Sequence, residues 1–269
     1  MSEKILSVKN LSYSPEKGKA PLYKDFSFSL EKGEFLLIAG SNGCGKSTLL
    51  KLLSGYLVPD KGRIFFSGEA YGEGKISHKK LLPGYVPQIL PECGNFTVRE
   101  LIQMGCSGRD FSCLFLSRKD REKVEEILEI MEISHLAERK LAALSTGEFR
   151  LAAIASILVK MPHLLLLDEP TASLDFHHGK KLMLLLEKYR KEKGTTILMT
   201  AHDLMVPVPF ATRVLLLKKG EILAEGEVEK VLTAENLQKT FCCDFDVTLS
   251  PSGYPAFSLK KPTPGERES

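Results

Sequence analysis

Short apolar runs along this chain predict β-strands, some of them buried on both faces. Residues 35–39 and 164–167 are continuous apolar runs of strand length, a pattern typical of parallel sheets that are covered on both sides. Residues 26–30 alternate Phe and Leu with Ser at period two, and residues 195–200 are rich in β-branched side chains. We therefore expect a sheet whose central strands are fully buried.

Amphipathic stretches between the apolar runs predict helices. Residues 120–133 place apolar side chains at helical spacing with charges on the opposite face, and residues 148–159 and 180–191 are further helical candidates. Because strand signals are scarce between about residues 97 and 157, we expect a helical insert within an α/β domain. A hairpin is expected at 214–224, turning through a Lys-Gly pair.

The composition indicates a chain that can form a substantial core and has little net charge. Of its 269 residues 43% are apolar, and 37 Lys and Arg against 34 Asp and Glu give a net charge of +3. This small imbalance does not indicate binding to nucleic acid, and the apolar runs are too short to cross a bilayer. The first ten residues lack the apolar core of a signal peptide, and the six cysteines form no C-x-x-C pair. These features predict a cytoplasmic protein with reduced thiols.

A glycine-rich segment between the buried run 35–39 and a helical stretch carries the clearest chemistry. Its sequence, G-S-N-G-C-G-K-S-T, matches the phosphate-binding pattern G-x-x-x-x-G-K-[ST] between a strand and a helix. The backbone N–H groups would surround phosphate oxygens, Lys46 would reach the β- and γ-phosphates, and Ser47 would hold Mg²⁺. The residues expected to bind nucleotide are Gly40, Ser41, Asn42, Gly43, Cys44, Gly45, Lys46, Ser47 and Thr48.

Two carboxylates follow the apolar run 164–167. At the carboxyl end of a parallel strand, Asp168 can hold Mg²⁺, and Glu169 is placed to orient or deprotonate an attacking water. The other interpretation is an ordinary acidic turn before Pro170. Together with the phosphate-binding segment, this pair would also suit a P-loop kinase or GTPase.

Four further short motifs narrow the choice. L-S-T-G-E at residues 144–148 is similar to an L-S-G-G-Q signature, and Y-V-P-Q at 85–88 is similar to a glutamine loop. S-L-D at 173–175 is similar to a D-loop, and A-H-D at 201–203 to a switch-histidine segment. Taken in their order along the chain, together with the two nucleotide motifs, these four segments resemble the motifs of the ATP-binding cassette (ABC) proteins.

The resemblance implies a fold and a domain organisation. The fold is α/β, a P-loop NTPase (RecA-like) ABC ATPase core with an inserted α-helical subdomain at about 97–157 and an N-terminal antiparallel β region. The ATPase domain would span residues 3–235, followed by a C-terminal extension at 236–269. After about residue 247 the sequence turns to Ser, Pro, Gly and charged residues, so we expect a loosely ordered tail.

The resemblance also implies roles for the motif residues. ATP would lie between the phosphate-binding loop of one copy and the signature of a second copy, where Ser145 and the N–H of Gly147 donate to the γ-phosphate. Gln88 would contact Mg²⁺ and the attacking water, and His202 would contact the γ-phosphate. Asp175 would lie at the contact between the two copies. The catalytic set is then Glu169, His202, Lys46 and Gln88, with Ser47, Gln88 and Asp168 at Mg²⁺.

Some positions depart from the family pattern. Thr146 stands where Gly is usual and could crowd the approach to phosphate, and Glu148 replaces Gln and adds a negative charge near ATP. Tyr13 is the nearest candidate for stacking on adenine, although it lies about two residues early; Tyr23 is a second candidate, and a packed strand tyrosine is the other interpretation. Cys44 lies where an alkylating reagent could block ATP.

Three features favour a metal-chelate importer. The chain is one cassette without a membrane-spanning run, so its permease would be separate. D-F-H-H at 175–178 is similar to a segment common in iron–siderophore, haem and cobalamin importers, and residues 226–247 resemble their C-terminal stretch. A generic cassette ending is the other interpretation, so an exporter ATPase and a soluble non-transport ABC ATPase stay as alternatives.

The partners implied by the resemblance are a second copy of this chain, two transmembrane permease subunits and, indirectly, a substrate-binding protein, with no nucleic acid. The helical insert and the Gln88 loop would form the groove that receives a short permease helix. The expected location is cytoplasmic, peripheral on the inner face of the cell membrane.

Overall fold

The computed structural model describes residues 3–16, 18–71, 83–90, 95–107, 117–172, 174–251 and 253–260. The strands are β1 (Lys4–Tyr13), β2 (Tyr23–Glu31), β3 (Phe35–Ala39), β4 (Lys61–Phe66), β5 (Glu69–Tyr71), β6 (Gly84–Val86), β7 (Leu164–Asp168), β8 (Thr196–Ala201), β9 (Arg213–Lys218), β10 (Glu221–Gly226), β11 (Phe245–Leu249) and β12 (Pro255–Leu259). The α-helices are α1 (Lys46–Leu53), α2 (Val98–Ser107), α3 (Arg118–Ile130), α4 (Thr146–Leu158), α5 (Phe176–Lys193), α6 (Val228–Val231) and α7 (Ala234–Phe241). Short 3₁₀ turns lie at Ser134–Leu136, Leu141–Ala143 and Val208–Phe210.

Within the described residues, a six-stranded sheet in the order β10-β9-β3-β8-β7-β6 forms the centre of the molecule. All neighbours from β9 to β6 are parallel, and β10 pairs antiparallel with β9 in the predicted hairpin. Strand β8 lies between β3 and β7 although it follows both in the chain. The carboxyl ends of β3, β8, β7 and β6 therefore meet along one edge of this sheet.

Both faces of the central strands are buried. In β3, Phe35, Leu37 and Ala39 belong to one apolar cluster with helices α2 to α5, whereas Leu36 and Ile38 belong to a second cluster with α1 and strands β1, β2 and β4. All five residues of β3 and all five of β7 are buried. The continuous apolar runs at 35–39 and 164–167 arise because alternate side chains enter two separate cores.

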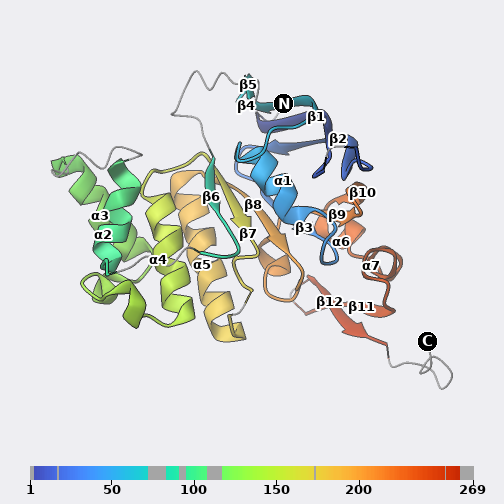
Figure 1. Ribbon diagram of the computed structural model, residues 1–269. Helices are drawn as coiled ribbons and strands as arrows, with labels where there is room; N and C mark the ends of the chain where they lie inside the picture. The colour runs from blue at the N-terminus through green and yellow to red at the C-terminus, as the bar shows by residue number, and fades with distance from the viewer. Residues whose placement is uncertain are drawn as a thin grey trace.

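The N-terminal region forms a second, antiparallel sheet in the order β2-β1-β4-β5. In β2, Phe26, Phe28 and Leu30 are buried while Ser27 is exposed, which confirms the period-two pattern. Figure 1 shows this sheet and α1 at one end of the molecule, away from the helical region. The N-terminal antiparallel β region that the resemblance implies is therefore present.

Helices α2, α3 and α4 form the helical region, and they lie together on the far side of α5 from the N-terminal sheet in Figure 1. Helix α3 buries Val124, Ile127, Leu128 and Ile130, which confirms the spacing predicted for residues 120–133. Helix α4 packs against α2 and against β6, so it connects this region to the central sheet. None of the helices in the described ranges is long and apolar enough to cross a membrane.

The C-terminal segment differs from our expectation. The boundary at 235/236 falls inside α7, whose Leu237 is fully buried in the core with β9 and β10. Beyond it, β11 and β12 pair as an antiparallel hairpin, with Val247 opposite Phe257. The described part of the tail is thus a strand pair rather than a loosely ordered stretch, because Phe245, Val247 and Phe257 pack against the core while the main chains of the two strands pair. Residues 261–269 lie outside the described residues.

Candidate active site

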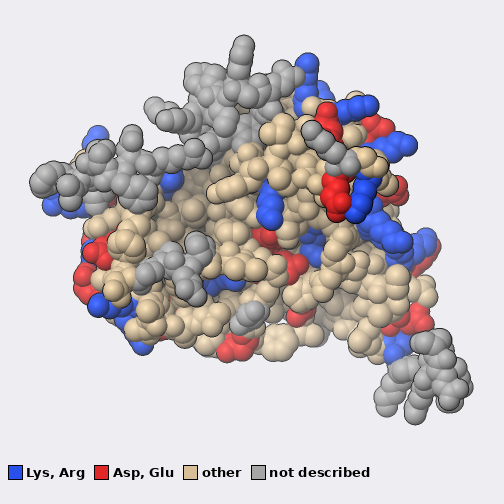
Figure 2. Space-filling model, viewed as in Figure 1, with Lys and Arg blue, Asp and Glu red and all other residues tan. Residues whose placement is uncertain are grey.

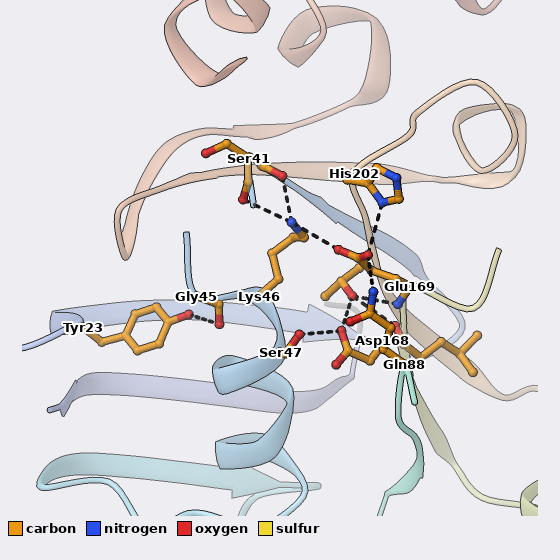
Figure 3. A network of polar contacts seen from close by, with 12 residues as sticks. Tyr23, Ser41, Gly45, Lys46, Ser47, Gln88, Asp168, Glu169 and His202 are labelled. Carbon is orange, nitrogen blue, oxygen red and sulfur yellow. Dashed lines mark hydrogen bonds and ion pairs between the residues drawn. The ribbon is translucent and has the colours of Figure 1, made fainter. Parts of the chain in front are cut away.

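Four parallel strands deliver the predicted nucleotide-binding residues to one edge of the sheet. Strand β3 ends at the loop 40–45, β7 ends at Asp168, β8 precedes His202 and β6 precedes Gln88. Figure 3 shows these segments converging on a single polar network. Residues that are far apart in the sequence therefore face one small volume, as expected at the carboxyl ends of strands in an α/β sheet.

The loop 40–45 has a backbone that only glycine accommodates easily at two places. Gly45, which precedes helix α1, has φ +117°, and a Cβ there would lie 2.4 Å from the Tyr23 hydroxyl oxygen. A Cβ on Gly40 would lie 2.3 Å from the Leu217 carbonyl oxygen. The fully buried Tyr23 also donates a hydrogen bond of 2.8 Å to the Gly45 carbonyl oxygen. A residue of the N-terminal sheet thus packs against the loop and restricts its backbone at Gly45.

Lys46 is the first residue of α1 and is 5% exposed. Its Nζ donates to the carbonyl oxygens of Gly40 at 2.8 Å and Ser41 at 3.3 Å, and lies 3.3 Å from Glu169 Oε1. The ammonium group is held within the loop that is expected to receive phosphate. Three oxygen partners stabilise a buried cation that would otherwise carry a large desolvation penalty.

The residues expected at Mg²⁺ form a compact oxygen cluster. Ser47 Oγ donates to Asp168 Oδ1 at 3.1 Å, and Thr200 Oγ1 donates to the same oxygen at 2.8 Å. Burial raises the pKa of the Asp168 carboxyl group, and these two hydrogen bonds act in the opposite direction. A hydroxyl and a carboxylate oxygen in contact fit the hard-ligand preference of Mg²⁺.

Glu169 is the centre of the network. Gln88 Nε2 donates to Glu169 Oε2 at 3.0 Å, and His202 Nδ1 lies 3.1 Å from the same oxygen (Figure 3). The Glu169 backbone is in the left-handed region, with φ +46°, and its N–H donates to Thr200 Oγ1 at 3.1 Å. A left-handed non-glycine residue costs on the order of 1 kcal/mol or more, so the surroundings hold this carboxylate in an unfavourable backbone conformation.

The signature residues form the N-terminus of α4. Ser145 caps the helix, its hydroxyl accepting from the Glu148 N–H at 3.3 Å while Glu148 Oε2 accepts from the Ser145 N–H at 2.7 Å. Arg139 lies 3.4 Å from the other Glu148 oxygen, and the hydrogen bond from Ser145 lowers the pKa of the Glu148 carboxyl group. Glu148, which departs from the family pattern, therefore completes a capping box with its negatively charged carboxylate.

His178 lies between Gly147 and Asp175 and is close to both. A Cβ on Gly147 would lie 3.3 Å from the His178 ring, and His178 Nδ1 lies 2.8 Å from an Asp175 oxygen at the N-terminus of α5. Among the described residues, no hydrogen bond or ion pair joins Ser145 or Gly147 to the loop 40–48. The signature residues therefore make no direct polar contact with this loop, whereas Asp175 lines the same pocket as His202. The remaining D-loop residue, Ser173, lies outside the described residues.

Tyr13 ends β1 and is half-buried. It pairs in register with Tyr23, the residue that contacts Gly45, and its carbonyl oxygen accepts from the Leu22 N–H at 2.8 Å. Tyr13 therefore lies one strand away from the phosphate-binding loop. Tyr23 itself is fully buried with its hydroxyl group engaged, so it serves as a packed brace and not as a stacking platform.

A search of known families gives a match over the segment that holds most of these residues. Residues 23–172 match the profile of the family described as ABC transporter. This chain is an ABC transporter ATPase. The fold class and the ATPase activity expected from the motifs are confirmed by this membership.

Full-length relatives extend the match over most of the ATPase. This chain is 34% identical over 236 residues to the iron(3+)-hydroxamate import ATP-binding protein FhuC of Bacillus subtilis (strain 168), and the match covers 87% of both chains. It is 30% identical over 244 residues to the ferric enterobactin transport ATP-binding protein FepC of Escherichia coli (strain K12), covering 90% of this chain and 89% of the relative. Other relatives of 34% identity are longer, and the ABC transporter ATPase spans 40% of their length.

A solved structure supports the same assignment. It is described as an inward-facing conformation of an ABC transporter assigned to the metal-chelate type, and it superimposes with a TM-score of 0.81 at 30% identity. The match covers 96% of the ABC transporter ATPase and 98% of that chain. The fold is therefore shared along nearly the full length of both.

Two residues at this site, Thr200 and Arg150, were not predicted from the sequence, and Tyr23 was considered only as a candidate for stacking on adenine. Thr200 binds both Asp168 and the Glu169 N–H, and Tyr23 holds Gly45. Arg150, in α4, is buried and donates to the main chain at Gln88. A weak signal was present for Arg150, a single cation within the otherwise apolar stretch F-R-L-A-A-I-A; Thr200 and Tyr23 resemble ordinary strand residues.

We expect Cys44 of the ATPase to resist alkylation in the native protein. The Cys44 side chain is 3% exposed, and burial raises the pKa of its thiol, although Lys46 partly offsets the shift. At pH 8 the thiolate fraction is correspondingly small, so iodoacetamide should modify Cys44 at least roughly tenfold more slowly than the exposed Cys242 and Cys243. Peptide mass spectrometry over time measures the rates, with the guanidinium-unfolded protein as the control. Equal rates in the folded protein would contradict a closed loop.

Proposed function

We propose that this ABC transporter ATPase couples MgATP hydrolysis to the import of a metal chelate of the iron–siderophore, haem or cobalamin type. The observation that carries the ATP chemistry is the network at Glu169, where Lys46, Gln88 and His202 each lie within 3.0–3.3 Å of one carboxylate. The cargo class is supported by the similarity to two import ATPases for iron chelates and to a metal-chelate type transporter.

Nucleotide binding exchanges the partners of Lys46. In the structure the ammonium group is paired with Glu169 and with two loop carbonyl oxygens. A phosphate group entering the loop competes for the same cation, and it releases Glu169 toward Gln88 and His202. Glu169 can then accept a proton from a water molecule. The oxygen of that water attacks the γ-phosphorus as the bond between the γ-phosphorus and the β-phosphate oxygen breaks.

Mg²⁺ fits the cluster formed by Ser47 and Asp168. The Ser47 hydroxyl and the Asp168 carboxylate are the two oxygen groups in contact, and the Gln88 amide is next to Glu169. When bound, Mg²⁺ would neutralise charge that develops on the β- and γ-phosphate oxygens. Thr200 keeps the Asp168 side chain oriented toward Ser47.

A second copy of this chain would complete the site. Ser145 and Gly147 lie at a helix N-terminus, the place where backbone N–H groups favour an anion, but they make no bond to loop 40–48 within the described residues. In a head-to-tail dimer they would donate to the γ-phosphate held by the partner's loop, with Asp175 at the contact. Tyr13 would stack on adenine, since it is half-buried and one strand away from the loop.

Two permease subunits would contact the region around Gln88. Ile89, directly after Gln88, is 83% exposed, and Tyr56, whose ring lies 5.6 Å from that of Tyr85, is 75% exposed. Apolar side chains of this kind beside the helical region suit a short permease helix. On the face in Figure 2, Lys and Arg are interspersed with Asp and Glu around a mostly uncharged centre. The chain would thus lie on the cytoplasmic face of the cell membrane, receiving its signal indirectly from a substrate-binding protein.

Co-purification from native membranes tests this assignment. A tagged copy of the chain is solubilised with its partners, which are identified by mass spectrometry. Recovery of separate multi-span permeases with a substrate-binding protein supports an importer, and the ligand of that binding protein identifies the cargo. Permeases without a binding protein would favour an exporter, and recovery with no membrane partner would favour a non-transport ATPase.

A further inference from the structure

Arg150 is a buried cation that the nucleotide motifs do not account for. It lies in the second turn of α4 and is 7% exposed. Its two terminal nitrogen atoms point at the glutamine loop: Nη1 donates to the Pro87 carbonyl oxygen at 3.1 Å, and Nη2 donates to the Gln88 carbonyl oxygen at 2.8 Å. One planar group therefore holds two successive peptide units of another segment.

Both ends of this contact are connected to functional elements. At one end, Arg150 follows the capping box of Ser145 and Glu148 by less than one helical turn, so it moves with the signature residues. At the other end, the Gln88 side chain donates to Glu169 Oε2 at 3.0 Å. A continuous set of contacts thus runs from the signature helix through Arg150 and Gln88 to Glu169.

The chemistry of the contact suits a specific positioning role. A guanidinium group is costly to bury, and burial lowers the Arg150 pKa, but two charge-assisted hydrogen bonds and the field of Asp168 act against that cost. Both acceptors are main-chain oxygens, so the contact fixes the path of the backbone at Gln88 and leaves the Gln88 side chain free to reach Glu169. An apolar residue would pack in this helix without any such constraint.

We propose that Arg150 is a positioning residue that ties the Gln88 segment to the first turns of α4. The position of the signature residues then sets the position of the Gln88 amide beside Glu169. When a second copy of the chain binds at the signature of the first copy, this contact shifts Gln88 of the first copy. The surroundings of the Glu169 carboxylate in that same copy change with it. The inference rests on the proposed role of Gln88 in hydrolysis.

A double-mutant cycle tests the coupling in the full chain. Arg150→Met should lower kcat for ATP roughly tenfold with little change in KM, since it loosens the support of a residue at the reaction centre. In a Gln88→Ala background, the same substitution should lower kcat no further, because the residue it positions is gone. Arg150→Lys, which keeps the charge but cannot span both carbonyl oxygens, should give an intermediate kcat.

A fluorescent reporter tests the same contact without ATP. The chain has no tryptophan, so Ile89→Trp places a single fluorophore at an exposed position next to Gln88. Arg150→Met should lower the fluorescence anisotropy of this tryptophan, as the segment gains freedom. The matched control is Tyr189→Phe, which removes a buried hydrogen bond of 2.9 Å to the Leu158 carbonyl oxygen at the other end of α4. It should lower the unfolding temperature but change neither kcat nor the anisotropy.

The outcomes separate this inference from the proposed function. If Gln88→Ala lowers kcat and Arg150→Met lowers it by the same factor in both backgrounds, Arg150 acts independently of Gln88 and the inference is overturned. It is also overturned if Tyr189→Phe reproduces the anisotropy loss, since the effect would then be general loosening of α4. If Gln88→Ala leaves kcat unchanged, the proposed role of Gln88 fails, and the anisotropy alone decides whether Arg150 holds the segment.

Discussion

Glu169→Gln should abolish ATP turnover while the protein continues to bind ATP. The carboxylate is 7% exposed and lies 3.0–3.3 Å from Gln88, His202 and Lys46, so it is the group positioned to accept a proton from the attacking water. Loss of a general base typically costs about 10²–10⁴ in rate, and we expect kcat to fall by at least about 100-fold. Release of inorganic phosphate measures turnover, and calorimetric titration measures ATP affinity.

The same substitution should strengthen ATP binding. In the structure the Glu169 carboxylate pairs with the Lys46 ammonium group that phosphate must recruit, and an amide competes for that cation less strongly. ATP should therefore hold two copies of the variant together long enough for light scattering after gel filtration to detect a dimer. Weaker ATP binding in the variant would contradict the exchange of partners at Lys46.

Glu187→Gln is the matched control for this change. Glu187 is a partly buried carboxylate of α5 that pairs with Arg190 at 2.7 Å and Lys191 at 3.1 Å, and it does not contact the nucleotide motifs. Its neutralisation removes comparable ion pairs and should leave kcat and ATP affinity unchanged. An active Glu169→Gln protein, with turnover close to that of the control, would remove Glu169 from its proposed role.

Lys46→Ala should prevent nucleotide binding itself. The Lys46 side chain is 4% exposed, and its Nζ is the cation held inside the loop that would receive phosphate. Truncating one partner of a buried charge pair costs about 2–5 kcal/mol, so we expect ATP affinity to fall by about 30-fold or more. Calorimetric titration with ATP measures the change, and unchanged affinity would contradict the phosphate-loop interpretation.

Two further variants separate binding from stability. Lys51→Ala removes an exposed lysine from the same helix, α1, and should leave affinity unchanged. Lys46→Ala also leaves Glu169 without its cation, which should lower the free energy of unfolding. The double variant Lys46→Ala with Glu169→Gln removes that unpaired charge, so it should regain stability in urea without regaining ATP affinity.

The protein neighbours that pack against loop 40–45 could not be predicted from its motif alone. The pattern predicts glycines where phosphate approaches, but the structure shows that Gly40 and Gly45 are also required by protein neighbours, the Leu217 carbonyl oxygen and the Tyr23 hydroxyl group. These neighbours come from β9 and β2, on either side of the loop in the fold. Their identity depends on strand order, and a local pattern carries no information on it.

The local features of this protein follow directly from the order of its amino acids. Apolar runs at 35–39 and 164–167 specify strands buried on both faces, since alternate side chains must enter separate cores. The helical spacing at 120–133 specifies α3, because one face of a helix must be buried. Motif chemistry likewise singled out Lys46 and Glu169 as candidates for phosphate binding and water activation, and the structure places their side chains 3.3 Å apart.

Which of these features contact one another depends on how the elements pack in the folded chain. Insertion of β8 between β3 and β7 brings Ser47 to Asp168 across 121 residues and makes Thr200 a partner of the Asp168 carboxylate and of the Glu169 main-chain N–H. Pairing of β11 with β12 brings Val247 and Phe257 together against the core, and Arg150 reaches Gln88 across 62 residues. Such contacts depend on the packing of whole elements against each other, so the residues that make them resemble ordinary strand, helix and loop positions until the chain is folded.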